Sequence, residues 1–128
     1  MAKRRMKLVV TLPPYQPKRM AWRREINARV QERRRDLKLR YAKDDKLTVS
    51  IRLYLQRPGH RSVMDVDNCA KQIVDALQGR FGGSKKNKYG KRLIPNDSQV
   101  WRLIVEKMPP PGQAKDSGGR LTITKHSA

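Results

Sequence analysis

Residues 65–77 read Asp-Val-Asp-Asn-Cys-Ala-Lys-Gln-Ile-Val-Asp-Ala-Leu, an acidic segment that continues into an amphipathic one. The apolar side chains of this stretch recur at the three- and four-residue spacing of a helix, and Gly79 stands where such a helix would end. The apolar stripe consists of Val66, Ala70, Ile73, Val74 and Leu77. The stretch therefore predicts a helix that begins inside an acidic motif and rests one apolar face on a core.

The segments on either side of this helix predict a sheet. Residues 46–55 alternate between apolar and polar side chains, which is typical of a half-buried strand. Shorter segments rich in β-branched residues at 6–12, 100–105 and 121–124 predict three further strands, and residues 19–40, which contain neither Gly nor Pro, predict another helix. We therefore expect one domain spanning residues 1–128, with a basic loop at residues 80–95 and a flexible Pro- and Gly-rich segment at residues 109–119.

The charge of the chain indicates a polyanionic partner. Lys and Arg number 31 against 11 Asp and Glu, which gives a formal net charge of +20. This excess of cations is the electrostatic footprint of a nucleic-acid-binding protein. No apolar run approaches the roughly 18 residues of a transmembrane helix, and no signal-peptide stretch follows the N-terminus. We therefore expect a soluble, cytoplasmic protein without a membrane partner.

Cysteine and histidine usage excludes two further kinds of site. The single cysteine, Cys69, cannot form an internal disulfide, which favours a reducing compartment. Cys69, His60 and His126 together do not supply the four ligands of a structural zinc site. Cys69 lies among apolar helix positions and is predicted to be a small core residue. We expect no small-molecule cofactor.

The acidic residues of the central region are few and clustered. Between residues 46 and 99 they are Asp65, Asp67, Asp75 and Asp97. Asp65 and Asp67 repel each other unless a cation lies between them, and Mg²⁺ prefers carboxylate oxygens together with substrate phosphate. Asp97 could join them if the chain after the basic loop returns beside the helix, and Lys71 could then neutralise charge on the phosphate. The alternative interpretation gives the first two aspartates a helix-capping role and makes Lys71 and Asp75 part of a solvated salt-bridge ladder.

These residues resemble the motif of a known family. Asp65-Val66-Asp67-Asn68, Lys71 and Asp75-Ala76-Leu77 follow the pattern D-x-D-N-x-x-K-x-x-x-D-A-L of the RusA family of Holliday junction resolvases. Residues 96–100, Asn-Asp-Ser-Gln-Val, resemble the later D-D-x-Q-V pattern of that family, with Asn96 in place of its first acid. The resemblance extends from about residue 57 to residue 105, and the basic segment 79–95 is longer than is usual for the family.

The resemblance implies a fold, a reaction and a set of site residues. The implied fold is α+β, with a mixed sheet of about four strands flanked by two main helices. The implied reaction is the paired hydrolysis of phosphodiesters in four-way DNA junctions during recombination and repair. A homodimer in a bacterial or phage-infected cell would carry it out with Mg²⁺, for which Mn²⁺ is expected to substitute. The residues carried over by position are the metal-binding Asp65, Asp67 and Asp97, the catalytic Lys71, and the supporting Asn68 and Asp75.

Basic and aromatic residues around the motif are candidates for DNA contact. The basic candidates are Arg57, Arg61, Lys85, Lys86, Lys88, Lys91 and Arg92. Trp22 and Trp101 are expected in the core or at a dimer contact, although an exposed tryptophan could wedge into a junction. Two other functions stay open at this point: a non-catalytic basic nucleic-acid-binding protein, and a RusA-like nuclease that acts on flaps or forks.

Overall fold

The computed structural model describes residues 7–14, 18–54, 66–80, 92–94, 97–108 and 118–126. Along the chain the elements are β1 (Leu8–Leu12), α1 (Arg19–Leu37), β2 (Leu47–Tyr54), α2 (Val66–Leu77), the 3₁₀ turn η1 (Asp97–Gln99), β3 (Val100–Met108) and β4 (Gly119–Lys125). The predicted α+β fold is confirmed, since two main helices accompany a four-stranded sheet.

The sheet is mixed, and its spatial order is β1-β4-β2-β3. β4 pairs antiparallel with both β1 and β2, whereas β3 runs parallel to β2. β1 and β3 therefore form the two edges of the sheet. The α2 segment lies between β2 and β3 in sequence, as the crossover that joins two parallel strands commonly does.

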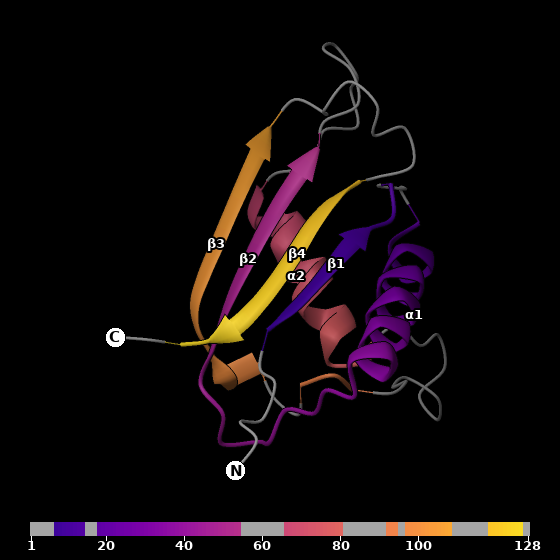
Figure 1. Ribbon diagram of the computed structural model, residues 1–128. Coiled ribbons are helices and arrows are strands. Elements are labelled where there is room, and N and C mark those ends of the chain that lie inside the picture. Colours follow the sequence, from indigo (N-terminus) through magenta and orange to yellow (C-terminus); the bar gives the residue numbers. More distant parts are fainter. Residues whose placement is uncertain are drawn as a thin grey trace.

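Both helices lie against the same face of the sheet (Figure 1). The alternating residues of β2 that the sequence predicted to be apolar on one side are buried: Leu47, Val49, Ile51 and Leu53. Trp22, Ile26 and Val30 from α1 and Ile73 and Leu77 from α2 complete this core. Full burial of one such large side chain contributes about 1.5–3 kcal/mol, so a single packed layer between helices and sheet holds the fold.

Helix α1 ends earlier than its sequence pattern predicts. The pattern extends to residue 40, but the helix ends at Leu37 because Lys38 adopts a left-handed conformation with φ of 53°. The N–H of Leu39 then turns back to the carbonyl of Arg34 at 3.0 Å, a bond typical of helix C-termini. The turn directs Leu39 and Tyr41 into the core instead of continuing the helix.

The beginning of β4 requires glycine. Gly119 has a φ of +150°, and a Cβ at this position would stand 2.0 Å from the carbonyl oxygen of Arg52 on β2. Gly118 donates its N–H to the carbonyl of Leu12 and accepts a bond from the N–H of Tyr54. The last two residues of the predicted flexible segment 109–119 thus join three strands, and the rest of that segment lies outside the described residues.

Candidate active site

Helix α2 begins inside the acidic motif, as predicted. Val66 is its first residue, and Asp67 lies in its first turn. Asp65 and the side chain of Asp67 lie outside the described part of the structure. Figure 1 places the start of α2 toward the end of the sheet where β2 and β3 finish. The backbone thus presents the first acidic motif at that end of the molecule.

The outer face of α2 carries the polar residues of the motif. Asn68 and Lys71 are exposed, whereas Cys69 and Ala70 between them are buried. Lys71 follows Asp67 by four residues, so the two positions lie one above the other on the helix surface. An exposed lysine one turn beyond an acid can reach a phosphate held at that acid, and the core role predicted for Cys69 is confirmed.

Asp75 joins the two helices. Its Oδ2 lies 3.0 Å from Nη2 of Arg23 on α1, and the two side chains are only 15% and 10% exposed. Arg23 also donates from Nε to Oε1 of Gln72 at 2.5 Å and from Nη1 to the carbonyl of Arg80 at 3.2 Å. Asp75 therefore holds α2 against α1 through an ion pair with an arginine of the other helix.

Arg23 is a structural residue that the sequence did not single out. It is one of many arginines in a basic helix, and only its 8% exposure distinguishes it from its neighbours. Four residues later along the same helix, Asn27 donates from Nδ2 to the carbonyl of Ala76 at 2.9 Å. These two polar residues fix the position of α2, and hence the position of the acidic motif at its start.

Asp97 opens η1, directly before β3. Its side chain is exposed, and Asn96 lies outside the described residues. The buried Gln99 anchors the turn, because its Nε2 donates to the carbonyls of Ala42 at 2.6 Å and Asp45 at 3.0 Å. These two carbonyls belong to the connection between α1 and β2, so Asp97 has a firmly held backbone beside the start of β2.

The structure does not bring Asp97 beside the start of α2 within one chain. Leu93 donates its N–H to the carbonyl of Leu77 at 2.8 Å, which returns the chain to the far end of α2. Figure 1 shows η1 at the end of the sheet where β2 and β3 begin, opposite the end where α2 begins. Among the described side chains, accordingly, no three His, Cys, Asp or Glu residues are grouped closely enough to hold a metal ion.

The donor chemistry of the motif nevertheless fits a hard divalent cation. Asp67 and Asp97 are oxygen donors on separately anchored backbone segments, and Asp97 is exposed. Mg²⁺ typically takes one or two carboxylates and completes its shell with water and substrate phosphate. These residues could therefore hold Mg²⁺, provided that the two segments meet.

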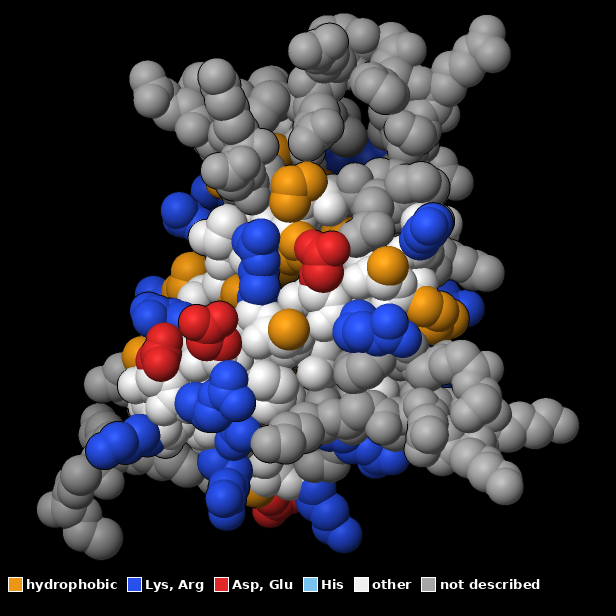
Figure 2. All heavy atoms as spheres, turned by 90° about the vertical axis from the view of Figure 1, so that its right-hand side faces the viewer, with side chains coloured by type: hydrophobic (Ala, Val, Ile, Leu, Met, Phe, Trp, Pro, Cys, Tyr) orange, Lys and Arg blue, Asp and Glu red, His pale blue; other side chains and the backbone are white. Residues whose placement is uncertain are grey.

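The structure describes only one of the basic residues predicted to contact DNA. Arg92 is described and exposed, whereas Arg57, Arg61, Lys85, Lys86, Lys88 and Lys91 lie outside the described residues. Figure 2, which views the α1 side, shows Lys and Arg side chains spread over this surface with few acids between them. Exposed members on α1 include Arg24, Arg33 and Arg35. This side therefore presents further cations to a polyanion.

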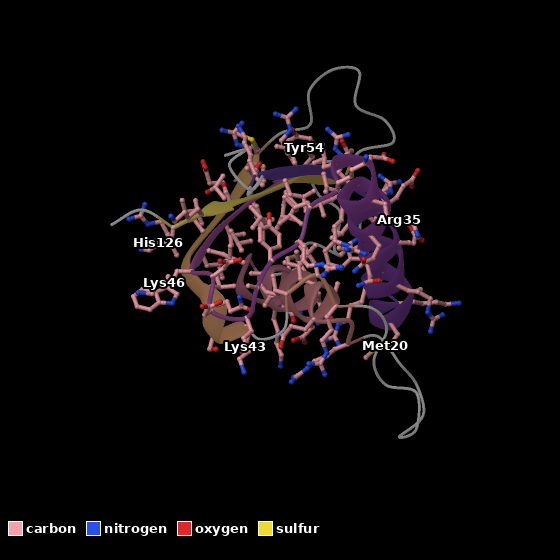
Figure 3. The ribbon with its side chains drawn as sticks, turned by 60° about the horizontal axis from the view of Figure 1, so that its bottom comes forward. Met20, Arg35, Lys43, Lys46, Tyr54 and His126 are labelled. Atoms are coloured by element: carbon pink, nitrogen blue, oxygen red, sulfur yellow. The ribbon has the colours of Figure 1, made fainter. Side chains whose placement is uncertain are left out.

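The two tryptophans occupy different environments. Trp22 is 1% exposed in the core, as predicted, and donates from Nε1 to the carbonyl of Pro13. Trp101 is 57% exposed; Lys46 Nζ lies 4.3 Å from the centroid of its ring, and the ring of His126 lies 5.9 Å away. Lys46 and His126 stand at one corner of the molecule in Figure 3. Trp101 thus lies outside the protomer core, which leaves a dimer contact or a wedge into a DNA junction as the predicted alternatives.

Comparisons with known proteins place the chain in a family. Across the described ranges, no helix is both long and apolar enough to span a bilayer. The search of curated proteins returned no match. The family model for endodeoxyribonuclease RusA matches residues 1–124 of the 128-residue chain. This match covers every described element from β1 to β4 except the last residue of β4. The chain therefore belongs to the RusA endodeoxyribonuclease family.

Proposed function

We propose that this protein is a divalent-metal-dependent endonuclease that resolves four-way DNA junctions by paired hydrolysis of phosphodiesters. The observation that carries the proposal is the family match over residues 1–124, combined with the D-x-D-N-x-x-K motif of residues 65–71, in which Asn68 and Lys71 are exposed on α2. The net charge of +20 supplies the attraction to DNA that such an enzyme needs.

The carboxylates of Asp65, Asp67 and Asp97 are the proposed metal ligands, with Mg²⁺ as the ion and Mn²⁺ as its substitute. A divalent ion held by these residues would supply Lewis-acid polarisation of the scissile phosphate and would activate a water molecule as the nucleophile. Lys71, exposed one turn after Asp67, places a cation where negative charge develops on the phosphate. The proposed roles are thus divided between two kinds of side chain: the carboxylates orient the ion, and the lysine stabilises negative charge on the substrate.

Asn68 and Asp75 support this arrangement in different ways. Oδ1 of Asn68 accepts a hydrogen bond of 3.4 Å from Nε2 of Gln72, and Gln72 in turn accepts from Arg23. Asp75 makes the ion pair with the same arginine. Both residues therefore connect the start of the motif to α1, which keeps α2 in place while charged groups on its outer face engage DNA.

The partner is proposed to be branched DNA, bound by a homodimer in the cytoplasm of a bacterial or phage-infected cell. A four-way junction has approximate two-fold symmetry, so two identical sites related by a two-fold axis suit two symmetric cuts. Arg92 and the basic candidates at residues 57, 61, 85, 86, 88 and 91 are proposed to contact phosphate. Such contacts set affinity and orientation more than sequence preference.

The test compares Asp67→Asn with Asp36→Asn, which makes the same chemical change at an exposed acid of α1. A synthetic four-way junction is incubated with each protein and Mg²⁺ or Mn²⁺. We expect the native chain and Asp36→Asn to introduce paired nicks across the junction, and Asp67→Asn to bind the junction without cutting it, because binding and catalysis are separate terms.

Two outcomes would contradict the proposal. Cleavage by none of the proteins under either metal would favour a non-catalytic nucleic-acid-binding protein. Efficient cutting of flaps or forks with four-way junctions left intact would reassign the substrate. Salt dependence is not informative here, since neutralising 6–10 phosphates lowers affinity by roughly 10³–10⁵ between 50 and 200 mM salt under every one of these functions.

A further inference from the structure

An open groove runs between helix α1 and the edge strand β1. Its volume is about 510 Å³, and residues 9–11 of β1 form one of its walls. Arg29 and Arg33 of α1 line the groove as well, and so does Arg120 of β4. Figure 1 shows α1 beside β1, at the edge of the sheet away from β3. Three arginines from two elements therefore meet along this edge.

The arginines of α1 occupy the outward carbonyl groups of β1. Arg29 donates from Nη1 to the carbonyl of Thr11 at 3.2 Å, and Arg33 donates from Nε to the carbonyl of Val9 at 3.3 Å. A guanidinium has five N–H donors, so each arginine keeps donors for a second partner. Because the N–H and C=O of an edge residue point to the same side of the strand, the N–H groups of Val9 and Thr11 also face the groove. The edge therefore offers donors and positive charge, which suits an anion.

The positive charge continues from the groove onto the outer face of the sheet. Thr11 of β1 stands opposite Arg120 of β4, and Arg120 stands opposite Arg52 of β2. Their neighbours Ile51 and Leu121 are buried on the side of the helices, so the two exposed arginines point to the opposite face (Figure 1). Four arginines, which we call the arginine track, thus extend from α1 past β1 to β2: Arg33, Arg29, Arg120 and Arg52.

The pair of Arg52 and Arg120 is unfavourable for the sheet itself. Like charges directly opposite each other on neighbouring strands are destabilising. Glu106 of β3 follows Arg52 in the same row and offsets one of the two charges. Glu32 and Asp36 of α1 also line the groove, but among the described side chains neither makes an ion pair with the track. In a chain with a net charge of +20, an anion bound along the track would relieve the remaining repulsion.

We propose that the arginine track is a second DNA-binding surface, which holds the phosphate backbone of one arm of a branched DNA. The choice of DNA as the polyanion rests on the proposed function. β1 and β2 are two strand spacings apart, about 10 Å, and a DNA strand carries one phosphate per about 3.4 Å of its axis. The track therefore spans about three successive phosphates of one strand. Guanidinium groups match the geometry of phosphate oxygens, to which they donate in pairs.

The track is separate from the proposed metal site. Helix α2 lies on the face of the sheet that the helices cover, whereas Arg52 and Arg120 lie on the outer face (Figure 1). Contacts to the phosphate backbone position a protein on DNA and carry no sequence information directly. The track therefore acts on the affinity for a junction and not on the rate of cleavage once the junction is bound.

The first test removes charge from the track. Arg52→Thr/Arg120→Thr deletes its outer half and leaves the arginines of α1 on their carbonyls. The matched control, Arg40→Thr/Lys43→Thr, removes the same charge from exposed positions in the connection between α1 and β2. Figure 3 shows Lys43 on the far side of the molecule from Tyr54, the last residue of β2.

Fluorescence anisotropy measures the affinity of each protein for a labelled four-way junction between 50 and 200 mM salt, without a divalent metal so that no strand is cut. Each lost phosphate contact lowers the slope of log affinity against log salt by about 0.9. The track variant should therefore lose about 1.8 from this slope and about 60-fold in affinity at 0.1 M salt. The control should change the slope by less than half as much. Equal changes in the two variants, or an unchanged slope in the track variant, would overturn the proposal.

Thermal unfolding of the same variants separates a lost contact from a damaged fold. Because Arg52→Thr/Arg120→Thr removes a like-charge pair, its Tm should stay at or above the native value. Loss of affinity at an unchanged Tm is the combination expected of a binding surface. A weaker affinity that appears only together with a lower Tm would identify the two arginines as structural and overturn the proposal.

Photocrosslinking locates the DNA on an otherwise native chain. Thr122 follows Arg120 by two residues on the same face of β4 and stands opposite Ser50 of β2. Thr122→Cys and Lys43→Cys are each labelled with a photoreactive group, and the native Cys69 is buried and stays unlabelled. We expect crosslinks to one arm of the junction from position 122. A yield at position 122 no greater than that at position 43 would overturn the proposal.

Cleavage at saturating protein separates this proposal from the proposed function. With Mg²⁺ and protein well above the dissociation constant, Arg52→Thr/Arg120→Thr should cut the junction at the native rate, because the motif on α2 is unchanged. A bound junction that stays uncut would place these arginines in the chemistry and overturn the second surface. If the native chain cuts no junction, the proposed function fails, and the salt slopes and crosslinks still decide whether the track binds DNA.

Discussion

Replacing Asp75 with Asn should destabilise the protein without removing its chemistry. The substitution keeps the shape of the side chain but deletes the charge that faces Arg23 at 3.0 Å. Arg23 keeps its bonds to Gln72 and to the carbonyl of Arg80, so its guanidinium stays in place. A largely buried cation then remains without its counter-charge, which is the costly result of breaking a buried ion pair.

The expected magnitude follows from the burial of the pair. Two unit charges at about 4 Å attract by about 4 kcal/mol at an effective dielectric constant of 20, and removing one partner of a buried pair costs about 3–5 kcal/mol. Because the side chains keep 10% and 15% of their exposure, we take the lower value, ~3 kcal/mol. With about 2.1 cal/mol/K of unfolding entropy per residue, a chain of 128 residues should lose about 11 °C in Tm.

The assay combines thermal and urea unfolding with junction cleavage. Asp36→Asn serves as the matched control and should leave Tm nearly unchanged, because Asp36 is exposed. A double-mutant cycle with Arg23→Met should give a coupling free energy of at least ~1.5 kcal/mol, since the second substitution removes the unpaired charge. At a temperature well below its transition, Asp75→Asn should still cut junctions.

Two results would refute this reasoning. If Asp75→Asn leaves both Tm and the urea midpoint at native values, the ion pair does not hold α2 against α1. If the variant is as stable as the native chain but inactive, Asp75 acts in the chemistry and not through Arg23. Loss of stability with retained activity is the one combination that the structure predicts.

Three further predictions concern other parts of the fold. Burial, followed by the nearby charge of Asp45, raises the pKa of Tyr41 well above its usual value near 10. The contribution of Tyr41 to stability should therefore be constant below pH 10 and should fall above pH 10 by about 1.4 kcal/mol per pH unit, because the tyrosine of the unfolded chain loses its proton first. The free energy of unfolding should fall less steeply with alkaline pH in Tyr41→Phe, and an unchanged slope would contradict the assignment. Gln99→Ala removes two hydrogen bonds from η1 and should lower the free energy of unfolding by about 1–3 kcal/mol. Because Asp97 lies in the same turn, the substitution should also weaken Mn²⁺ binding. Titration calorimetry would measure this binding, with Ser98→Ala as the control. Gly119→Ala places a Cβ 2.0 Å from a backbone oxygen and should prevent β4 from pairing in register, which would appear as loss of the cooperative unfolding transition; a native-like transition would show that the β2–β4 approach is looser than described.

Much of the fold follows from local pattern. The alternation of residues 46–55 and the helical stripe of residues 66–77 each identified an element and its buried face, because strand and helix backbones impose periods of 2 and 3.6 on the side chains. The acidic motif at the start of α2 could also be recognised from the sequence, because its residues are close together in the chain and follow the spacing of one helix. Element ends were less accurate: Lys38 ends α1 through its own left-handed backbone, which no apolar pattern records.

The sequence by itself thus determined the elements, the core faces, the family motif and the charge that suits DNA. Only the tertiary structure decided which distant groups meet. It paired Asp75 with Arg23, which lies 52 positions earlier in the sequence, and bonded two arginines of α1 to the carbonyls of the edge strand β1. It also placed η1, whose first residue is Asp97, at the opposite end of the sheet from the start of α2. Spacing along a chain fixes neighbours within one element, whereas contacts between elements depend on how their buried faces pack, and that packing is a property of the whole chain.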